Sequence, residues 1–389
     1  MKINFIGGFF PENKIKEYQE NTSGIFQYAA DSLQKSIIVG LQLNNITTEL
    51  ITIPFLANYP NYSKIYIKKE KTSTYQSIPF INFKLIDSIS KSYHLRKTIK
   101  KEIKNDKEEI ILIYGMFDYF LNSIPKKQKN KICLIVPDLP AMMGGDLNKF
   151  YIKLYLKFIE NRIKKNLYKI DCFVLISKKM KVVYNIKNKH WVMVKGIYNN
   201  KNQINPQKKE KNITLFYTGT LAKRYGILDL LEAFKMITGE NFVLWICGDG
   251  DGKGEVENAT KNDKRIKYLG QIPNEQVQVL QRRATILINP RKSDSEFTKY
   301  SFPSKTMEYL ASGTPTVMHR LEGIPEEYFK FCFSPVEQNV HSLKEKIIEI
   351  SNLTPLEREN FGKQAQEFIF NNKNPKIQTE KIIEMLKKI

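Results

Sequence analysis

One segment in the second half of the sequence has residue types suited to holding a diphosphate. Residues 289–315 lead from a short apolar run into a helical pattern, in which Ser301 is a plausible N-cap and Pro303 suits the first turn. Free backbone amides and the helix dipole at such a start favour an anion. The amides expected to point there belong to Phe302, Ser304 and Lys305.

Glu308 lies about one turn further along the same helical pattern. Because side chains on a helix lean toward its N-terminus, this carboxylate returns toward the free amides. A carboxylate is repelled by phosphate itself, but it suits two adjacent hydroxyls, such as those of a ribose beside a bound diphosphate. The plainer alternative is a capped helix with an ordinary glutamate near its start.

A second turn of this kind follows the apolar run at residues 213–218. Gly219 and Thr220 open the turn. Lys223 and Arg224 follow, just ahead of another helical pattern. Glycine lets a ligand approach the backbone closely, and the two cations could neutralise phosphate charge that amides alone cannot. Two solvated surface cations are the alternative.

The first half carries weaker signals. Gly7 and Gly8 end the first apolar run, where they either admit a sugar or an anion or simply form a tight turn. Asp138 stands between Pro137 and Pro140 after another apolar run, where it could accept a hydrogen bond from a sugar hydroxyl or cap the chain locally. No G-x-G-x-x-G motif is present, which disfavours a nicotinamide or flavin site.

Short apolar runs alternate with helix-period segments along the whole chain, which predicts parallel sheets covered on both faces by helices. The strands are expected at residues 2–6, 46–53, 81–85, 110–114, 132–136, 172–176, 191–194, 213–218, 242–247, 266–269, 286–289 and 316–319. The helices between and after them are expected at 24–41, 87–104, 147–167, 227–237, 276–283, 304–311, 355–370 and 376–388.

This order predicts an α/β protein with two doubly wound, Rossmann-like domains that face a cleft. Residues 1–198 would form the first domain and residues 213–389 the second. Between them, residues 199–212 have no apolar periodicity and are expected to form a linker. The last helix could extend the second domain or cross back to the first.

The composition predicts an anionic partner. The chain has 389 residues and a formal net charge of +22. The net charge is +17 in residues 1–200 and +5 in the remainder. Nucleic acid, nucleotide phosphates and an acidic membrane face all fit this charge. The four cysteines are far apart and have no metal-ligand spacing, and no apolar run is long enough to span a bilayer, so a cytoplasmic location is expected.

Residues 300–315 resemble the donor-binding segment of GT-B, family 4-like retaining glycosyltransferases. Their FPSK-x-x-EYL-x-SG-x-P pattern is similar to a form found in bacterial surface-polysaccharide transferases. That segment normally has two glutamates with seven residues between them. Glu308 matches the second, which holds the nucleotide ribose in this family. Tyr300 stands in place of the first, which in the family contacts the transferred sugar.

The resemblance covers nearly the whole chain and implies that the Gln271–Ile272 backbone lies at the nucleobase. At Asp138 the family often has a His-Asp pair, but here Pro137 precedes the aspartate. Pattern and resemblance together assign catalytic roles to Asp138, Lys223, Arg224 and Glu308. The expected donor-binding residues are Gly8, Gly219, Thr220, Gly248, Gln271, Ile272, Arg291, Tyr300, Ser301, Phe302, Pro303, Ser304, Lys305 and Glu308. Gly7, Gly8 and Asp138 are expected on the acceptor side.

Residues Leu147–Leu167 form an amphipathic pattern in which aromatic and aliphatic residues lie on one face and Lys149, Lys153 and Lys157 on another. This pattern is typical of helices that lie on anionic lipid, and also of an ordinary domain helix packed on a sheet. We therefore expect the protein to be cytoplasmic, with peripheral attachment to the inner face of the cell membrane as one alternative.

The function predicted from these features is the transfer of a hexosyl group from a nucleotide diphosphate sugar, first of all a UDP-sugar, to a glycan or lipid-linked saccharide with retention. Capsule, exopolysaccharide or O-antigen synthesis would be its setting. Neither a cofactor nor a metal is expected, because no suitable carboxylate cluster is present. The rivals are a sugar-nucleotide epimerase or hydrolase of the same fold and a basic nucleic-acid-binding protein, although no nucleic-acid motif is present and nucleic acid is not expected as a partner.

Overall fold

The computed structural model describes residues 1–24, 26–84, 86–138, 150–183, 186, 188–200, 205–293 and 302–389. The chain divides into two compact units. The first consists of Met1–Ile197 together with Pro375–Ile389, and the second is Tyr198–Asn374. The boundary between the units therefore lies at residue 197, and the C-terminal helix belongs to the first unit rather than to the second.

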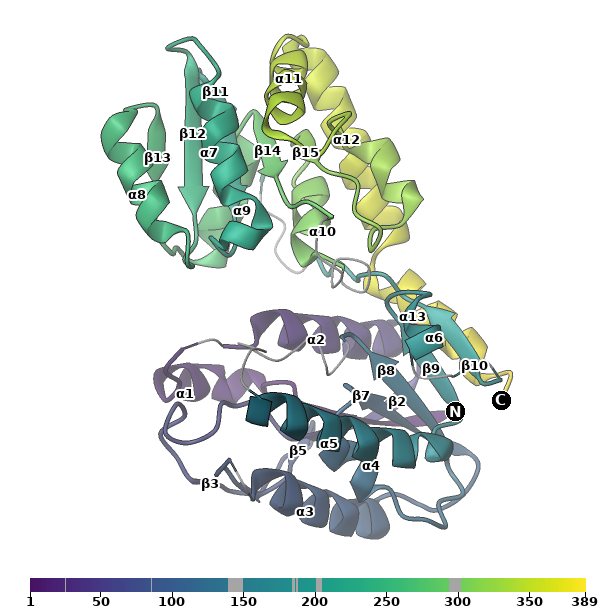
Figure 1. The fold of residues 1–389 in the computed structure, drawn as a ribbon. Coiled ribbons are helices and arrows are strands. Elements are labelled where there is room, and N and C mark those ends of the chain that lie inside the picture. The colour runs from purple at the N-terminus through teal and green to yellow at the C-terminus, as the bar shows by residue number, and fades with distance from the viewer. Residues whose placement is uncertain are drawn as a thin grey trace. The chain divides into compact units, whose positions relative to one another are not determined.

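The first unit is built on one large sheet with the strand order β10-β9-β8-β7-β1-β2-β5-β4 (Figure 1). All neighbouring strands are parallel except β4 and β5, which pair antiparallel at one edge. The strand order reverses between β1 and β7: β2 and β5 follow β1 on one side, and β7 to β10 follow on the other. The strands are β1 (Lys2–Gly7), β2 (Thr47–Thr52), β4 (Glu70–Lys71), β5 (Gln76–Ser77), β7 (Glu109–Tyr114), β8 (Lys131–Val136), β9 (Cys172–Leu175) and β10 (His190–Met193).

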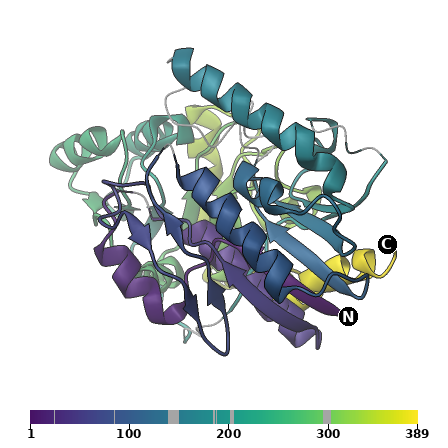
Figure 2. The ribbon, with the colours of Figure 1, turned by 90° about the horizontal axis from the view of Figure 1, so that it is seen from below.

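Helices cover both faces of this sheet, as Figures 1 and 2 show. Helices α2 (Tyr28–Leu43) and α13 (Pro375–Leu386) pack together on one face, and α3 (Asp87–Glu102), α4 (Asp118–Ser123) and α5 (Phe150–Asn166) cover the other. The remaining elements are η1 (Glu12–Lys14), α1 (Ile15–Glu20), the antiparallel pair β3 (Tyr66–Ile67) and β6 (Phe80–Ile81), η3 (Leu167–Lys169) and α6 (Met180–Val183).

The C-terminal helix joins the first unit through a close contact with α2. A Cβ atom at Gly40 would lie 2.3 Å from the carbonyl oxygen of Pro375, so only glycine permits this approach. Asn44 then donates a hydrogen bond of 3.0 Å to the Thr379 hydroxyl. Buried Ile382 and Leu386 complete the core on this face of the sheet.

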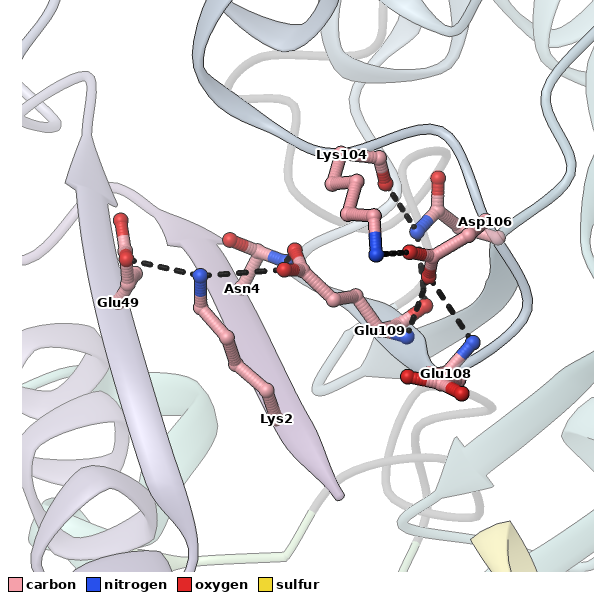
Figure 3. A network of polar contacts seen from close by, with 8 residues as sticks. Lys2, Asn4, Glu49, Lys104, Asp106, Glu108 and Glu109 are labelled. Carbon is pink, nitrogen blue, oxygen red and sulfur yellow. Dashed lines mark hydrogen bonds and ion pairs between the residues drawn. The ribbon is translucent and has the colours of Figure 1, made fainter.

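The amino-terminal edge of the first sheet carries a network of charges (Figure 3). Lys2 Nζ lies 2.9 Å from Glu49 Oε1 and 3.2 Å from Glu109 Oε1, and Asn4 donates to the same Glu109 carboxylate at 2.9 Å. The hydrogen bond to Glu49 is the main reason that the pKa of Lys2 is raised. Asp106 accepts hydrogen bonds from backbone amides at this edge. These groups satisfy one another, so the edge serves to join strands.

The second unit has one parallel sheet with the order β13-β12-β11-β14-β15. Its strands are β11 (Ile213–Thr218), β12 (Phe242–Cys247), β13 (Ile266–Tyr268), β14 (Ile286–Asn289) and β15 (Thr316–Met318). The helical elements are η4 (Lys223–Tyr225), α7 (Ile227–Lys235), α8 (Lys253–Asn262), α9 (Asn274–Arg283), α10 (Ser304–Ala311), η6 (Glu326–Phe331), α11 (Val340–Ser351) and α12 (Pro355–Asn372).

Apolar residues that alternate along these strands explain how the helices cover the second sheet. Leu215 and Leu244 pack under α7 and α11 on one face, while Phe216, Trp245 and Leu287 pack under α9 and α10 on the other. The α/β class and the two Rossmann-like units predicted from the sequence are therefore confirmed. As in the first sheet, the strand order reverses at one point, here between β11 and β14.

Several predicted elements differ from the structure. The run at residues 81–85 was expected to be a strand of the main sheet, but only Phe80–Ile81 is extended, and it pairs with β3. The helix expected from residue 24 begins at Tyr28. In the expected linker, described residues 205–212 have no helix or strand, and Lys209 Nζ donates to Thr314 Oγ1 at 2.8 Å, so this segment is tied to the second unit.

Candidate functional site

Two loops meet at the point where the strand order of the second sheet reverses, which is where open α/β sheets bind ligands. One loop follows β11 and the other follows β14. Gly226, at the end of the first loop, has φ of 81°, and a Cβ atom there would lie 2.3 Å from the carbonyl oxygen of Pro290. Glycine is therefore required for the two loops to approach each other.

Two arginines from these loops flank one aromatic ring. The guanidinium carbon of Arg224 lies 5.1 Å from the centre of the Tyr225 ring, and that of Arg291 lies 4.8 Å from it. Burial lowers the pKa of Arg291, and the nearby positive charge of Arg224 contributes to the same shift. Two like charges held close together at a ligand-binding edge create a site that favours an anion.

The loop after β12 is locked against the loop after β11 by backbone hydrogen bonds. The Gly219 amide donates to Cys247 O at 3.0 Å, the Leu221 amide donates to Asp249 O at 2.9 Å, and the Gly252 amide donates to Leu221 O at 2.7 Å. These bonds fix the backbone that leads to Arg224.

Helix α10 is attached to the end of β11 by the hydroxyl of Tyr309. This hydroxyl accepts a hydrogen bond of 2.9 Å from the Thr218 amide and donates one of 3.1 Å to the Thr218 carbonyl oxygen. Tyr309 is 1% exposed, so the contact is sheltered from water. Helix α10 is thereby fixed at the carboxyl end of β11, the strand that leads to Arg224.

The start of α10 differs from the prediction in one respect. Pro303 occupies the N-cap position and Ser304 is the first helical residue, whereas the sequence pattern placed Pro303 in the first turn behind a Ser301 cap. Pro303 contributes no side-chain cap, so the amides of Ser304 and Lys305 remain at the helix end. Ser301 and Tyr300 lie outside the described residues.

Glu308 forms an ion pair within this helix. Its Oε2 lies 2.7 Å from Lys305 Nζ, and the two side chains are 26% and 32% exposed, so both are accessible. The charge of Lys305 and a hydrogen bond from the Ile272 backbone both act on the Cys247 thiol, which places Lys305 and the loop after β13 around the end of β12. Burial is the main cause of the raised pKa of Cys247.

The structure places the other predicted donor residues in different surroundings. Lys223 forms an ion pair with Glu255 of α8, and Arg291 is the cation that lies near the same Tyr225 ring as Arg224. Gln271 and Thr220 are exposed, and the carbonyl oxygen of Thr220 accepts a 2.7 Å hydrogen bond from the Tyr217 hydroxyl. Gly248 lies in the locked loop after β12.

The expected glycine site in the first unit is corrected by the structure. Gly8 is buried, and its amide donates a 2.7 Å hydrogen bond to the side chain of Gln34 on α2. Gly7 is also buried. A Cβ atom at Gly8 would lie 2.0 Å from the Phe55 ring, so glycine is needed here for packing. The Gly8 amide is therefore occupied by protein and is not available to an anion or a sugar.

Asp138 follows β8 at the carboxyl edge of the first sheet, as predicted, and it is exposed. Its carboxyl group nevertheless lies among enough protein atoms for desolvation to raise its pKa to about 6. The negative charge of Asp138 in turn contributes to the raised pKa of Tyr114, at the end of the neighbouring strand β7, where burial is the main cause. A carboxyl group of this kind is ionised at neutral pH and can accept a hydrogen bond from a hydroxyl.

We expect the Asp138→Asn variant to be more stable than the original protein at pH 7.5, by about 1 kcal/mol once solvent exposure is allowed for. Because the folded pKa is raised, the ionised carboxylate disfavours the folded state above pH 6. The stability gain should shrink as the pH falls from about 6 toward 4, where the native carboxyl is protonated in the folded state. Urea unfolding at pH 7.5 and 4.5 measures this. A gain that grew on acidification would contradict the assignment, and Glu326→Gln serves as an exposed control.

Three residues of the site escaped the sequence analysis as individual candidates, namely Tyr225, Gly226 and Tyr309. Tyr225 and Gly226 belonged to the predicted turn, but nothing in one sequence indicates that the ring is flanked by arginines. Tyr309 lay next to Glu308 and matched a buried helical position. His319, at the end of β15, is 1% exposed, and burial lowers its pKa to about 4, so it is neutral at physiological pH.

Two further properties concern the described residues only. They contain no group of three or more His, Cys, Asp or Glu residues that could hold a metal ion. None of the helices in the described ranges is both long and apolar enough to cross a membrane.

Comparison with known proteins assigns the fold and the second unit. Residues 199–368 match the family model described as glycosyl transferases group 1. The second unit is thus a glycosyltransferase domain. The two units together have the GT-B fold of the solved structures described next. No curated protein matches the chain by sequence.

Solved structures of the same fold are similar over the whole chain. Sucrose-phosphate synthase from Thermosynechococcus elongatus has a TM-score of 0.66 at 14% identity, with 100% of this chain and 99% of that chain covered. The lipopolysaccharide outer core galactosyltransferase WaaB gives 0.63 at 14% identity, with coverage of 100% and 99%. A variant of TarM from S. aureus, in complex with fondaparinux, alpha-GlcNAc-glycerol and UDP, gives 0.64 at 11% identity, with coverage of 99% and 100%.

Proposed function

We propose that the chain transfers a hexosyl group from a UDP-sugar to a glycan or lipid-linked saccharide acceptor with retention of the anomeric configuration. The setting would be the synthesis of capsule, exopolysaccharide or O-antigen. The observation that carries this proposal is the pair of guanidinium groups, from Arg224 and Arg291, on either loop of the switch point in a glycosyltransferase domain. The choice of uridine is supported by the TarM variant, whose complex includes UDP.

The donor diphosphate would bind between the two arginines and the start of α10. The arginines supply charge-assisted hydrogen bonds, and the free amides of Ser304 and Lys305 add donors where the helix dipole is positive. Arg224 and Arg291 are held in place by Tyr225, so little side-chain entropy is lost on binding. These groups contact the diphosphate and not the sugar, so they would bind the donor whichever sugar it carries.

Glu308 would hold the ribose of the same nucleotide. In this structure its carboxylate is paired with Lys305, a half-buried ion pair within one helix that is open enough to solvent to exchange partners at little cost. When the nucleotide binds, the two ribose hydroxyls can donate to the Glu308 oxygens, while Lys305 turns toward the phosphates. The loop at Gln271 and Ile272, which lies next to the end of β12, would then cover the nucleobase.

Catalysis would follow from charge stabilisation and positioning. As the bond between sugar and diphosphate breaks, negative charge grows on the leaving phosphate oxygen, and Arg224 and Arg291 stabilise it. In a retaining transfer the acceptor hydroxyl attacks from the face that the diphosphate leaves, so a phosphate oxygen can take the hydroxyl proton. Asp138 would accept a hydrogen bond from the acceptor and orient it.

A thermal-shift comparison tests the donor assignment. We expect UDP and UDP-sugars to raise the melting temperature of the full chain by several degrees at about 1 mM, because a ligand that binds only the folded state stabilises it by mass action. GDP and dTDP should act more weakly. No shift with any nucleotide diphosphate would overturn the proposal.

Product analysis separates the proposal from its rivals. A sugar-nucleotide epimerase would change the sugar without an added acceptor, and a hydrolase would release free sugar. A transferase should give stoichiometric UDP release only when an acceptor is present. If the protein shifted the electrophoretic mobility of labelled RNA or DNA but bound no nucleotide sugar, the hypothesis of a basic nucleic-acid-binding protein would be favoured instead.

A further inference from the structure

The first unit exposes a patch of large apolar side chains along α3 and the neighbouring β3–β6 pair. Helix α3 lies on the outer side of this unit in Figures 1 and 2. Each of these side chains is between 38% and 63% exposed. We call them the α3 surface, and they are Ile65, Tyr66, Ile81, Phe83, Ile86, Ile89 and Tyr93.

The first turns of α3 expose apolar residues and bury a lysine, while Leu95 and Ile99 further along the helix are buried as usual. Ile89 is 61% and Tyr93 63% exposed, whereas Lys91, two positions from each, is only 7% exposed. Lys91 Nζ lies 2.8 Å from Asp87 and 4.7 Å from the centre of the Phe80 ring. A helix that buries a lysine and exposes an isoleucine and a tyrosine gives up hydrophobic stabilisation that the unit could have used.

Contacts within the unit make the α3 surface continuous. Tyr66 and Ile81 are direct partners across β3 and β6, so their side chains share one face, while Ile67 and Phe80 point into the core. The Ile81 amide then donates a 3.0 Å hydrogen bond to Ser90 Oγ on α3. Apolar side chains from two strands and one helix therefore form a single patch.

A buried carboxylate, that of Asp118, links α3 to α5. Ser88 Oγ donates a 3.0 Å hydrogen bond to Asp118 Oδ2, and Arg162 Nη1 lies 3.4 Å from that oxygen. The guanidinium of Arg162 stacks on Phe158, which is 57% exposed. Phe158 is thus a separate exposed apolar side chain, on the helix that the sequence pattern selected.

The charges around the α3 surface are mainly positive. Its acidic residues are paired with lysines: Glu70 with Lys14, Asp87 with Lys91, Glu102 with Lys71, and Glu17 with Lys64. Exposed lysines lie among and beside the apolar residues, and they are Lys64, Lys68, Lys69, Lys84, Lys97, Lys100 and Lys101. Two copies of this chain would repel each other across such a surface, whereas a bilayer with anionic headgroups offers both an apolar layer and the opposite charge.

We propose that the α3 surface docks the first unit on a lipid bilayer that contains anionic phospholipid. Tyr66, Ile89 and Tyr93 enter the interface between headgroups and acyl chains, and the surrounding lysines contact the headgroups. The use of this docking, which is access to a lipid-linked acceptor, rests on the proposed function, whereas the docking itself does not. The main membrane contact is thus made by α3 and the β3–β6 pair, and not by α5.

Vesicle flotation with the full chain and no substrate tests the proposal. We expect binding to vesicles of 70% phosphatidylcholine and 30% phosphatidylglycerol, with at least tenfold weaker binding to pure phosphatidylcholine. The double variant Ile89→Ser, Tyr93→Ser should lower the partition coefficient on the anionic vesicles at least tenfold. Both positions are exposed, so the variant is expected to fold, and circular dichroism verifies this.

A matched control comes from the second unit, where Val336 is 90% and Leu356 66% exposed. The double variant Val336→Ser, Leu356→Ser removes similar exposed apolar groups and should bind vesicles like the original chain. Unchanged vesicle binding by the α3 variant, or loss of binding caused only by Phe158→Ser, would overturn the proposal. A dimer that the α3 variant abolishes would also do so.

The outcome for this surface is independent of the donor site. Thermal shifts with UDP report on the second unit, and flotation without nucleotide reports on the first. If the chain binds vesicles but no nucleotide changes its melting temperature, the docking surface is supported and the proposed function is wrong. If UDP raises the melting temperature but the chain does not bind vesicles, only the docking surface is wrong.

Discussion

The Glu308→Ala variant is expected to bind UDP roughly 30- to 150-fold more weakly than the original protein. Two hydrogen bonds from ribose hydroxyls to an ionised acceptor contribute about 2–3 kcal/mol in total, and alanine removes both. Glu308 is accessible on α10 and is paired only with Lys305 of the same helix among the contacts described, so its loss should leave the fold intact. Isothermal titration with UDP measures the affinity, and urea unfolding checks the stability.

A nucleotide without ribose hydroxyls makes this prediction specific. The original protein should bind 2′,3′-dideoxy-UDP much more weakly than UDP, whereas Glu308→Ala should bind the two equally. Glu326→Ala, an exposed glutamate of the same unit, provides the matched control and should not alter UDP affinity. If Glu308→Ala still preferred UDP over the dideoxy compound by the original factor, Glu308 would not be the ribose ligand.

The sequence predicted the second unit better than the first. Its five strands are short continuous apolar runs that fill a parallel sheet, and β12, β14 and α10 were predicted with the bounds that the structure shows. The motif around Glu308 also fell at the start of a helix, as expected. Glycine or proline follows the end of β11, β12, β13 and β14 within two residues, so the loops that form the site are visible in the sequence.

The first unit was harder to predict because its ligand edge depends on long-range packing. Gly8 looked like part of an open turn, but Gln34 and Phe55 fill the space around it, and neither is near it in sequence. The residues between β2 and α3 form very short strands whose pairing depends on tertiary contacts. Periodicity carries no signal for such elements.

The ion-pair partners of charged residues and the exposure of side chains could not be predicted from the sequence either. Lys223 and Arg224 are adjacent, yet Glu255 of α8 takes Lys223 while Tyr225 holds Arg224 close to Arg291. The contacts that each of two neighbouring cations makes are decided by partners that are distant in sequence. Similarly, Leu95 and Ile99 form a conventional buried stripe on α3, but only the structure shows that Lys91 lies on the same buried face.

The Gly248→Ala variant is expected to lose about 2–4 kcal/mol of folding free energy and most of its UDP affinity. Gly248 has φ of 141°, which residues with a side chain rarely adopt, and a Cβ atom there would lie 1.8 Å from the Gly219 carbonyl oxygen. The added methyl group must push apart the loops after β11 and β12. Arg224 follows the first of these loops, so the diphosphate site is displaced as well.

The same substitution elsewhere in the unit separates this steric effect from a general loss of glycine. Gly254 lies in α8, where a Cβ atom would meet no atom within 4 Å, so Gly254→Ala should be neutral or stabilise the protein by up to about 1 kcal/mol through helix propensity. Urea unfolding and UDP titration of both variants measure the contrast. Equal stability of the two variants would show that the loops after β11 and β12 can separate freely. In that case the backbone hydrogen bonds between Gly219, Leu221 and the β12 loop would not fix the position of Arg224, and the anion site would have to be organised by the nucleotide itself.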